Sequence, residues 1–312
     1  MSPALHAAAV VILAFTLDLA FGDPPNRFHP VAWIGDALAA GRRRLCQGSP
    51  PRLLLSGGAV TLAAIALMAA AGALVSGLAA ALGPAGVAVE AVALKTTLSP
   101  RGLVSAARSI TEALARGALD DARARLGLHL VSRPTATLDT GQVASGAVES
   151  VAENLTDAVV APVVFFVVLG MPGAFAYRAL NTADTMLGYR DGPLEHFGKI
   201  AARLDDLANL LPARLAALAI VVAAGVRAPA AWAVMTRDHA RTASPNAGWT
   251  MAAMAGALDV TLEKPSAYRL GHGPRPTPED ISRSIRILTR AGILAIGTLV
   301  SLHVVIKKIV MQ

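Results

Sequence analysis

The chain has 312 residues, of which 54% are hydrophobic and only 16% are charged. A soluble protein of this length needs more charge to cover its surface, so the composition indicates an integral membrane protein. The net charge of +7 does not indicate a nucleic-acid partner, because basic residues stand in short clusters beside apolar runs. Such clusters are typical of the positive-inside bias of membrane proteins. They are Arg42, Arg43 and Arg44, and Lys307 and Lys308.

The first predicted element is a membrane span over residues 3–21. This segment is apolar apart from His6, Thr16 and Asp18. No basic region precedes it, and it ends in GDPP rather than in a cleavage site of small residues, so we expect it to be retained. The single cysteine, Cys46, excludes an internal disulfide framework and a cysteine-based zinc site.

A second apolar block covers residues 53–98 and is too long for one span of about 20 residues. A glycine and a proline interrupt it at residues 83–84, which predicts a full span over residues 54–82 followed by a shorter helix that returns. The returning helix contains Glu90 and Lys95. Two interpretations stay open: these charges face protein or a wet cavity, or Lys95 extends from the helix end toward water.

Polar helices are predicted over residues 99–157. Ser99 is a preferred N-cap residue, and the proline that follows it is favoured at the first helical position. Another helix is expected to begin at Asp139, with Gln142 placed to complete a capping box. Near the C-terminus, TPED at residues 277–280 opens a further well-capped helix.

The remaining apolar runs are shorter. Residues 158–171 provide only about 14 positions, which favours a buried or re-entrant segment over a full crossing. Residues 210–226 are long enough to cross with tilt, and residues 291–306 predict a last span. Between them, residues 172–210 and 227–290 are predicted to be polar helix and loop. The whole chain is therefore expected to be one all-α domain, a polytopic membrane protein with about 4–6 membrane-embedded helices, some re-entrant, and helical polar loops.

Carboxylates gather at the end of the helix that begins near Asp139. Glu149, Glu153 and Asp157 are spaced i, i+4 and i+8, so they are expected to share one helix face, with Asn154 beside them. Like charges at this spacing repel each other, so the arrangement needs arginines or a cation to compensate it. It is either a solvated acidic face or a site for a divalent cation such as Mg²⁺.

Four further segments concentrate arginines, carboxylates and amides. They are GDPPNRFHPVAWIG (residues 22–35), YRALNTADTMLGYR (177–190), ARLDDLAN (202–209) and SPNAGW (244–249). In ARLDDLAN, Asp205 and Asn209 are predicted to lie on one helix face, whereas Arg203 and Asp206 are expected to form an ordinary ion pair. Arginines bind phosphates through paired hydrogen bonds, and carboxylates bind Mg²⁺. The residues alone therefore predict a metal-dependent, phosphate-handling site assembled between helices.

The same segments resemble the CbiB/CobD family of cobalamin biosynthesis proteins, the adenosylcobinamide-phosphate synthases, over nearly the whole chain. In chain order the segments that carry the resemblance are LDLAFGDPPNRFHPVAWIG, KTTLSPRGL, VSRPTATLD, ESVAENLTDAVVAP, YRALNTADTMLGYR, FGKIAARLDDLANLLPARL, SPNAGWTMAAMAGAL and RPTPEDI. One segment departs from the family pattern: EKPSAYRLGHG, residues 263–273, is shorter than expected.

The resemblance implies an ATP-dependent ligase. Such an enzyme joins a propionate carboxylate of adenosylcobyric acid to the amine of (R)-1-amino-2-propanol O-phosphate, or of aminopropanol itself, and gives adenosylcobinamide phosphate or adenosylcobinamide. ATP and Mg²⁺ are the implied cofactors, and the cobalt corrinoid is a substrate. The implied catalytic residues are Glu149, Glu153, Asp205 and Asp206, and the implied metal ligands are Glu153, Asp157 and Asp205. The implied substrate-binding residues are His29, Lys95, Arg101, Asn154, Arg178, Asn181, Asp184, Tyr189, Arg203, Asn209, Ser244 and Asn246.

Two other functions stay open. Broken apolar segments with embedded charges also fit a polytopic transporter of a small polar or phosphorylated solute. A non-catalytic membrane scaffold or sensor is the third interpretation, because a fold does not determine a function. The expected location is the inner (cytoplasmic) cell membrane, with several crossings and the polar clusters on the cytoplasmic side. The expected partners are the lipid bilayer, the corrinoid and aminopropanol phosphate substrates and other cobalamin-pathway enzymes, and not nucleic acid.

Overall fold

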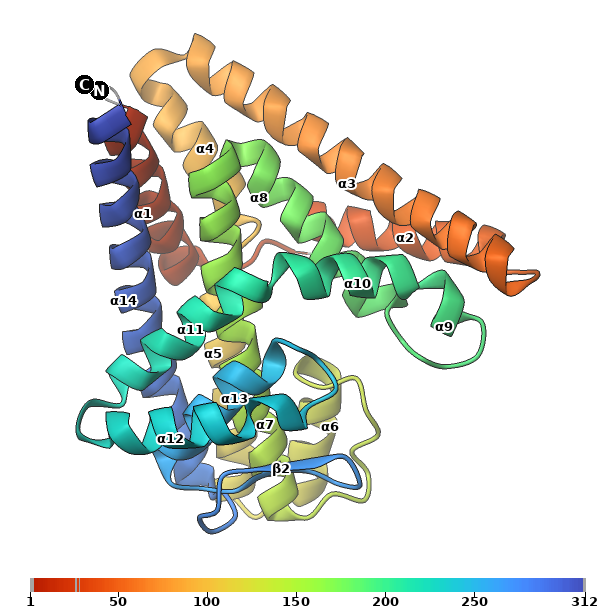
Figure 1. Cartoon of the computed structure of the whole chain (residues 1–312), viewed down its shortest axis with the longest axis vertical. Helices are drawn as coiled ribbons and strands as arrows, with labels where there is room; N and C mark the ends of the chain where they lie inside the picture. Colours follow the sequence, from red (N-terminus) through yellow and green to blue (C-terminus); the bar gives the residue numbers. More distant parts are fainter. Residues whose placement is uncertain (1–2, 26, 28, 311–312) are drawn as a thin grey trace. The chain divides into compact units, whose positions relative to one another are not determined.

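The computed structural model of the chain describes residues 3–25, 27 and 29–310. Asn26 and Phe28, in the polar segment after the first helix, lie outside the described residues. Helices make up almost all of the regular structure (Figure 1), together with one short antiparallel hairpin. The predicted all-α class is confirmed.

Two compact units make up the chain, and each combines separate stretches of sequence. Unit 1 consists of Met1–Ser99, Ala161–Asn209 and Thr298–Gln312, and unit 2 consists of Pro100–Val160 and Leu210–Gly297. The expectation of one domain over residues 1–312 stays a prediction.

Unit 1 is built around a long helix, α3, and a shorter helix that returns beside it. A left-handed Gly83 starts the 3-10 turn between them, so the predicted break and the predicted returning helix are confirmed. The elements of this unit are α1 (Pro3–Phe21), α2 (Pro30–Leu45), α3 (Pro50–Ala81), η2 (Gly83–Ala85), α4 (Gly86–Lys95), α8 (Ala161–Leu187), α9 (Leu194–Phe197) and α10 (Lys199–Ala208), with the last turns of α14 (Pro278–Val310).

Helix α8 is interrupted at Gly170, whose φ of 69° is a left-handed conformation that glycine adopts without steric cost. Pro172 follows, and the two halves of α8 run in different directions (Figure 1). Gly72 of α3 packs against this bend, because a Cβ there would lie 2.7 Å from the carbonyl oxygen of Met171. The expected burial of residues 158–171 is confirmed for most of them. The polar helix expected from residue 172 is present up to Leu187 and carries Arg178, Asn181 and Asp184, whereas its first residues, 173–176, are still apolar.

Within the described residues, three helical stretches are long and apolar enough to cross a membrane. One of them covers all but the last residue of the predicted span at residues 54–82, and another contains the predicted span at residues 291–306, so both predictions are confirmed as apolar helices of sufficient length. A broken pair of helices, α10 with α11, would add a fourth, and α1 contributes a shorter apolar helix. The three stretches are Pro50–Ala81, Thr140–Leu187 and Pro278–Ile309.

Unit 2 packs its helices around α7 and α13, both of which are almost completely buried. The sequence predicted only polar helix and loop for residues 227–290, and this is wrong for α13 and for the β-hairpin that follows it. The elements of this unit are α5 (Pro100–Ala115), α6 (Leu119–His129), α7 (Thr140–Leu155), the π-helical turn η3 (Thr156–Val160), α11 (Leu210–Ala223), η4 (Gly225–Arg227), α12 (Ala228–Asp238), η5 (His239–Arg241), α13 (Ala247–Leu258), β1 (Leu262–Lys264), β2 (Tyr268–Leu270) and most of α14.

Candidate functional site

The first polar cluster is centred on a buried carboxylate in unit 2, Glu149 of α7. The predicted capping box starts this helix: the backbone N–H of Gln142 donates to the Asp139 side chain at 2.8 Å, and the Gln142 side chain accepts from the Asp139 backbone at 3.0 Å. The following two and a half turns are buried, which makes α7 a core helix. Glu149 is only 5% exposed and therefore requires partners.

Three side chains supply those partners. The Ser145 hydroxyl donates to Oε1 of Glu149 at 2.8 Å, the Tyr268 hydroxyl donates to Oε2 at 2.9 Å, and the Arg133 guanidinium lies 3.4 Å from Oε2. Ser145 Oγ also accepts from the backbone N–H of Glu263 at 2.6 Å, which joins α7 to β1. Burial and the charge of Glu149 raise the pKa of Tyr268 far above its ordinary value, so this hydroxyl keeps its proton and acts as a donor.

The two carboxylates that follow have different surroundings. Glu153 is exposed on α7, whereas Asp157 is half-buried in the π-helical turn η3, where hydrogen bonds run from i to i+5. Glu153 lies one α-helical turn after Glu149, and the π-helical turn begins before Asp157, so the common face predicted for all three residues stays a prediction. The Asn154 side-chain amide donates to the Ser150 carbonyl at 2.9 Å.

The SPNAGW segment forms the turn before α13, also in unit 2. The Ser244 hydroxyl accepts from the backbone N–H groups of Asn246 and Ala247, at 3.2 and 3.3 Å, so it shapes the turn. Asn246 is buried, and its side-chain oxygen accepts from Arg214 of α11 at 2.5 Å. The same guanidinium lies 4.8 Å from the ring centroid of Trp249. These contacts fix Asn246 in one orientation.

A second carboxylate cluster lies in unit 1, between α8 and α10. Asn209 donates its amide to Asp205 at 2.9 Å, which confirms that the two share a helix face. The amide of Asn181 lies 3.4 Å from the other oxygen of Asp205, and the Tyr177 hydroxyl donates to the Asn209 carbonyl oxygen at 3.0 Å. Arg178 lies 3.4 Å from the Asn181 side-chain oxygen. The motifs YRALNTADTMLGYR and ARLDDLAN thus meet in one hydrogen-bonded network.

A third cluster, also in unit 1, surrounds Asp23 in the loop after α1. Lys95 Nζ lies 3.2 Å from Asp23 and 4.0 Å from Asp18, and Ser99 donates to Asp23 at 2.7 Å. Lys95 is only 7% exposed, so it faces protein, and the interpretation that it extends into water is wrong. Burial alone raises the pKa of Asp23, but hydrogen bonds from His29 and Ser99 and the charge of Lys95 outweigh it and hold this pKa well below its ordinary value.

The other charge on the returning helix also faces protein. The carboxylate of Glu90 lies 2.7 Å from Nε2 of His6 and accepts from the Ser76 hydroxyl at 3.0 Å. Glu90 is 8% exposed, so α4 presents both of its charged residues to neighbouring helices.

The predicted site residues divide between the units. No three His, Cys, Asp or Glu side chains in the described part of the chain are close enough together to hold a metal ion. The predicted metal ligands Glu153 and Asp157 belong to unit 2, and Asp205 belongs to unit 1. Unit 1 holds His29, Lys95, Arg178, Asn181, Asp184, Tyr189, Arg203, Asp205, Asp206 and Asn209, and unit 2 holds Arg101, Glu149, Glu153, Asn154, Asp157, Ser244 and Asn246.

Several cluster members were not predicted from the sequence. Arg133 and Asp23 stand inside segments that carry the family resemblance, and this was the available signal for them. Tyr268 stands in the segment that departs from the family pattern, so no sequence signal indicated it. The Arg203–Asp206 pair, expected to be an ordinary helix pair, has its nearest atoms 4.0 Å apart, with 72% of the Arg203 side chain exposed.

Known proteins are similar to this chain over most of its length. A model of the family described as CobD/Cbib protein matches residues 11–288. The cobalamin biosynthesis protein CobD of Dehalococcoides mccartyi (strain CBDB1) is 42% identical over 95% of this chain and 96% of its own. The probable cobalamin biosynthesis protein CobD of Methanothermobacter thermautotrophicus is 40% identical, over 86% and 88%. The cobalamin biosynthesis protein CbiB of Salmonella paratyphi B is 35% identical, over 93% and 95%. No solved structure matches the chain.

Proposed function

The chain belongs to the CobD/CbiB family, and from this premise we propose that it is a membrane enzyme of cobalamin biosynthesis. Its reaction would be the ATP-dependent ligation of (R)-1-amino-2-propanol O-phosphate to a propionate carboxylate of adenosylcobyric acid. The observation that supports this proposal is the match to relatives named for cobalamin biosynthesis over nearly the whole chain. Polar clusters built from the same segments are consistent with it.

The reaction requires an activated carboxylate, because a free carboxylate resists attack by an amine. A propionate oxygen attacks the γ-phosphorus of ATP, the bond to the bridging oxygen breaks, and ADP leaves. The amine nitrogen then attacks the acyl carbon of the resulting acyl phosphate, and inorganic phosphate departs with the electron pair of the C–O bond. The surplus proton on nitrogen passes to a base, and the enzyme holds the reactants in line.

Glu149 and Glu153 take different roles in this proposal. Both oxygens of Glu149 accept hydrogen bonds, so it acts as a positioning residue that holds Tyr268 and Arg133. Glu153 lies one turn later and is exposed, which suits a base that takes the proton from the amine. In unit 1, the amides of Asn181 and Asn209 would bind polar groups of the corrinoid.

The predicted metal ligands would suit a Mg²⁺ ion that is bound partly by substrate phosphates. Mg²⁺ commonly binds one or two carboxylates together with substrate phosphates and does not need a cage of three protein ligands. Glu153 and Asp157 are two such carboxylates in unit 2, and Asp205 is a third in unit 1. A bound Mg²⁺ would neutralise phosphate charge. Arg101, Arg178, Arg203 and Lys95 stay the proposed phosphate contacts of the protein itself.

Product formation by the detergent-purified chain tests this proposal. The protein is given adenosylcobyric acid, ATP, Mg²⁺ and either aminopropanol phosphate or aminopropanol, and the corrinoid is followed by mass spectrometry. We expect an ATP-dependent mass gain of one amide linkage, with release of ADP and phosphate. Glu153→Gln should lower turnover about 100-fold or more, whereas Glu279→Gln, at an exposed position in the first turn of α14, should not. Uptake of labelled amine into vesicles without product would instead favour the transporter.

A further inference from the structure

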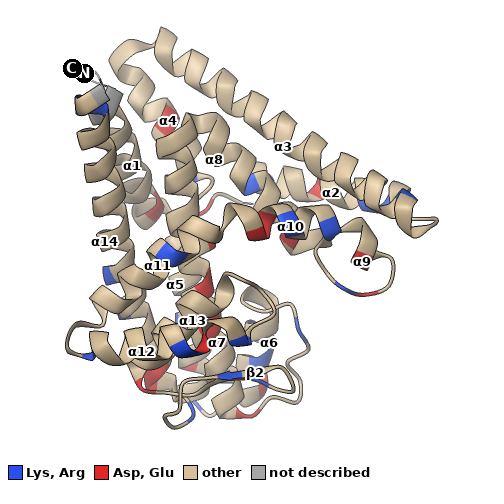
Figure 2. Cartoon of the chain, in the orientation of Figure 1, with Lys and Arg blue, Asp and Glu red and all other residues tan. Residues whose placement is uncertain are grey.

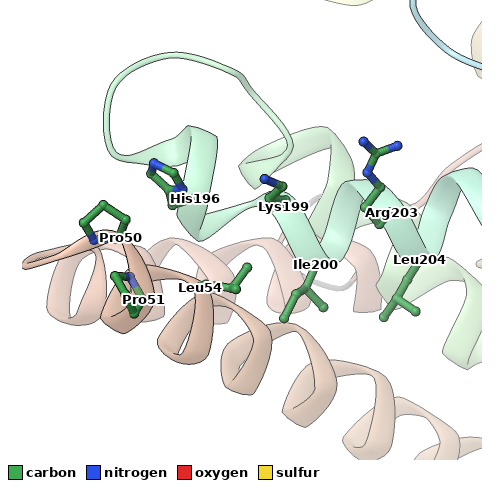
Figure 3. A pocket seen from close by; sticks show the side chains of 8 residues that line it. All are labelled: Pro50, Pro51, Leu54, His196, Lys199, Ile200, Arg203 and Leu204. Carbon is green, nitrogen blue, oxygen red and sulfur yellow. The ribbon is translucent and has the colours of Figure 1, made fainter.

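A groove lies in unit 1 between the first turns of α3 and the helices α9 and α10 (Figure 3). Its volume is about 590 Å³. Ile200 and Leu204 point toward α3, whereas Arg203 lies on the opposite side of α10 (Figure 3). The surface of the groove is therefore mainly apolar, and the charged ends of Lys199 and Arg203 lie at its edge. Its lining consists of Pro50, Pro51, Leu54, His196, Lys199, Ile200, Arg203 and Leu204.

Helical spacing and glycine contacts fix this arrangement. Lys199 and Arg203 are four residues apart in α10, which places their charged ends along one side, and His196 lies in the preceding short helix α9. On the other side, a Cβ at Gly58 of α3 would lie 2.5 Å from Cδ1 of Ile200, so α10 packs directly on the α3 backbone. The two sides of the groove are consequently held by rigid helices.

The length of α3 places the groove at a defined depth in a membrane. The helix has 32 residues and is therefore about 48 Å long. A bilayer measures about 40–45 Å with its headgroups, so a moderately tilted α3 begins at the level of the lipid phosphates. Its flank is open: only 17% of its most apolar window is buried, and Leu55, the residue after Leu54 of the groove lining, is 73% exposed.

Basic residues gather around this end of unit 1, together with the exposed Glu195 of α9. Three arginines end α2, Arg52 lies in the first turn of α3, and Lys199 is exposed (Figure 2). A soluble phosphate would use these cations and leave Leu54 and Leu204 uncovered. An anionic phospholipid matches both sides, because its headgroup is negative and its acyl chains are apolar.

We propose that this groove binds an anionic phospholipid. Its headgroup phosphate contacts Lys199, Arg203 and His196, and an acyl chain lies along Leu54 and Leu204. The site goes beyond the proposed ligase reaction. Arg203 has a part in both proposals, but neither Lys199 nor Leu54 has a role in the reaction, so variants of these two residues test the lipid site separately.

Native mass spectrometry of the full-length, delipidated protein tests the site. It is titrated with phosphatidylglycerol, with phosphatidylcholine of the same acyl chains, and with glycerol phosphate. We expect phosphatidylglycerol to bind about tenfold more tightly than phosphatidylcholine, and Lys199→Glu to remove most of this preference. Leu54→Ser should weaken binding of both lipids and leave the preference. Arg108→Glu, an exposed charge reversal on α5 of unit 2, should change neither.

Three results would overturn the proposal. Equal binding of the two lipids would remove the role of the cations. A loss in Arg108→Glu as large as in Lys199→Glu would mean general attraction between charges. Displacement of the lipid by an equal concentration of glycerol phosphate would mean a site for soluble phosphates. A gel-filtration profile and unfolding midpoint like those of the unchanged protein confirm that each variant is folded.

Discussion

Glu149 in unit 2 and Asp205 in unit 1 are carboxylates on helices beside apolar segments, but they are held in different ways. Glu149 accepts from two hydroxyls and has a guanidinium nearby, and one of these hydroxyls comes from a residue 119 positions away. Asp205 accepts from side-chain amides on α8 and on its own helix, 24 and 4 positions away. The Glu149 cluster connects parts of unit 2 that are far apart in the sequence. The Asp205 cluster contains amides that can also form hydrogen bonds with a polar substrate.

The largest effect is expected from Glu149→Ala. The substitution leaves Arg133 and Tyr268 without their acceptor, and breaking a buried pair in this way typically costs about 3–5 kcal/mol. The thermal unfolding midpoint of the purified protein should fall by several degrees, with loss of ligase activity. Glu153→Ala, at an exposed position one turn away, provides the matched control for stability. Equal midpoints for the two variants would contradict the anchoring role of Glu149.

Asp205→Asn should have a smaller effect than Glu149→Ala. Both oxygens of Asp205 face amide N–H groups, and an asparagine would turn its own NH₂ toward one of them. An unmatched buried donor costs about 1–3 kcal/mol, so the midpoint should fall less than in Glu149→Ala. Activity should fall as well, because the amides of Asn181 and Asn209 lose their orientation. Asp206→Asn is the neighbouring control for stability, and a larger fall there would refute the assignment.

Tyr268→Phe tests the long-range character of the Glu149 cluster. It removes one hydroxyl without changing the ring, and the loss of one hydrogen bond to a charged group costs about 1.5–3 kcal/mol at most. Amide hydrogen exchange should accelerate in β1 and β2, because the hairpin loses one of its ties to α7. Ser145 still binds the backbone of Glu263, so β1 should be less affected than β2. Unchanged exchange in both strands would show that the hydroxyl does not anchor the hairpin.

A smaller, pH-dependent effect is expected at Asp23 of the third cluster. Its pKa in the folded protein is held below the ordinary value of 3.8. A lowered carboxyl pKa contributes stability that is fully present above the ordinary value and is lost as the pH falls below it. The difference in unfolding midpoint between the unchanged protein and Asp23→Asn should therefore shrink between about pH 5 and about pH 3. A constant difference across this range would show that the charge of Asp23 is not stabilising.

The sequence predicts the parts of these clusters that depend on local rules. The capping box at Asp139, the break at residues 83–84 and the shared face of Asp205 and Asn209 follow from spacing within a few turns. The contact of Tyr268 with Glu149 does not, because it joins residues far apart in sequence. The π-helical turn at Asp157 is a second feature that regular helical spacing does not predict.

Mean hydropathy does not predict which apolar helices are buried in the protein. The stretches Pro50–Ala81 and Thr140–Leu187 have nearly the same mean hydropathy, 2.2 and 2.3, yet 17% and 67% of their apolar windows are buried. An apolar residue that faces lipid and one that faces protein contribute equally to such an average. For this reason the sequence predicts the presence of membrane-type helices and does not distinguish the lipid-facing α3 from the α7–α8 stretch.

The smallest effect is expected from Arg203→Gln. This substitution tests whether the exposed Arg203 belongs to the hydrogen-bonded network around Asp205. The nearest charged atoms of Arg203 and Asp206 are 4.0 Å apart, and 72% of the arginine side chain is exposed. Exposed pairs of this kind contribute about 0.2–0.5 kcal/mol, which added salt reduces. The unfolding midpoint should therefore change by about one degree or less, and the change should disappear in high salt. A fall as large as that of Asp205→Asn would mean that Arg203 belongs to the buried network, because only a desolvated partner makes the loss of one charge so costly.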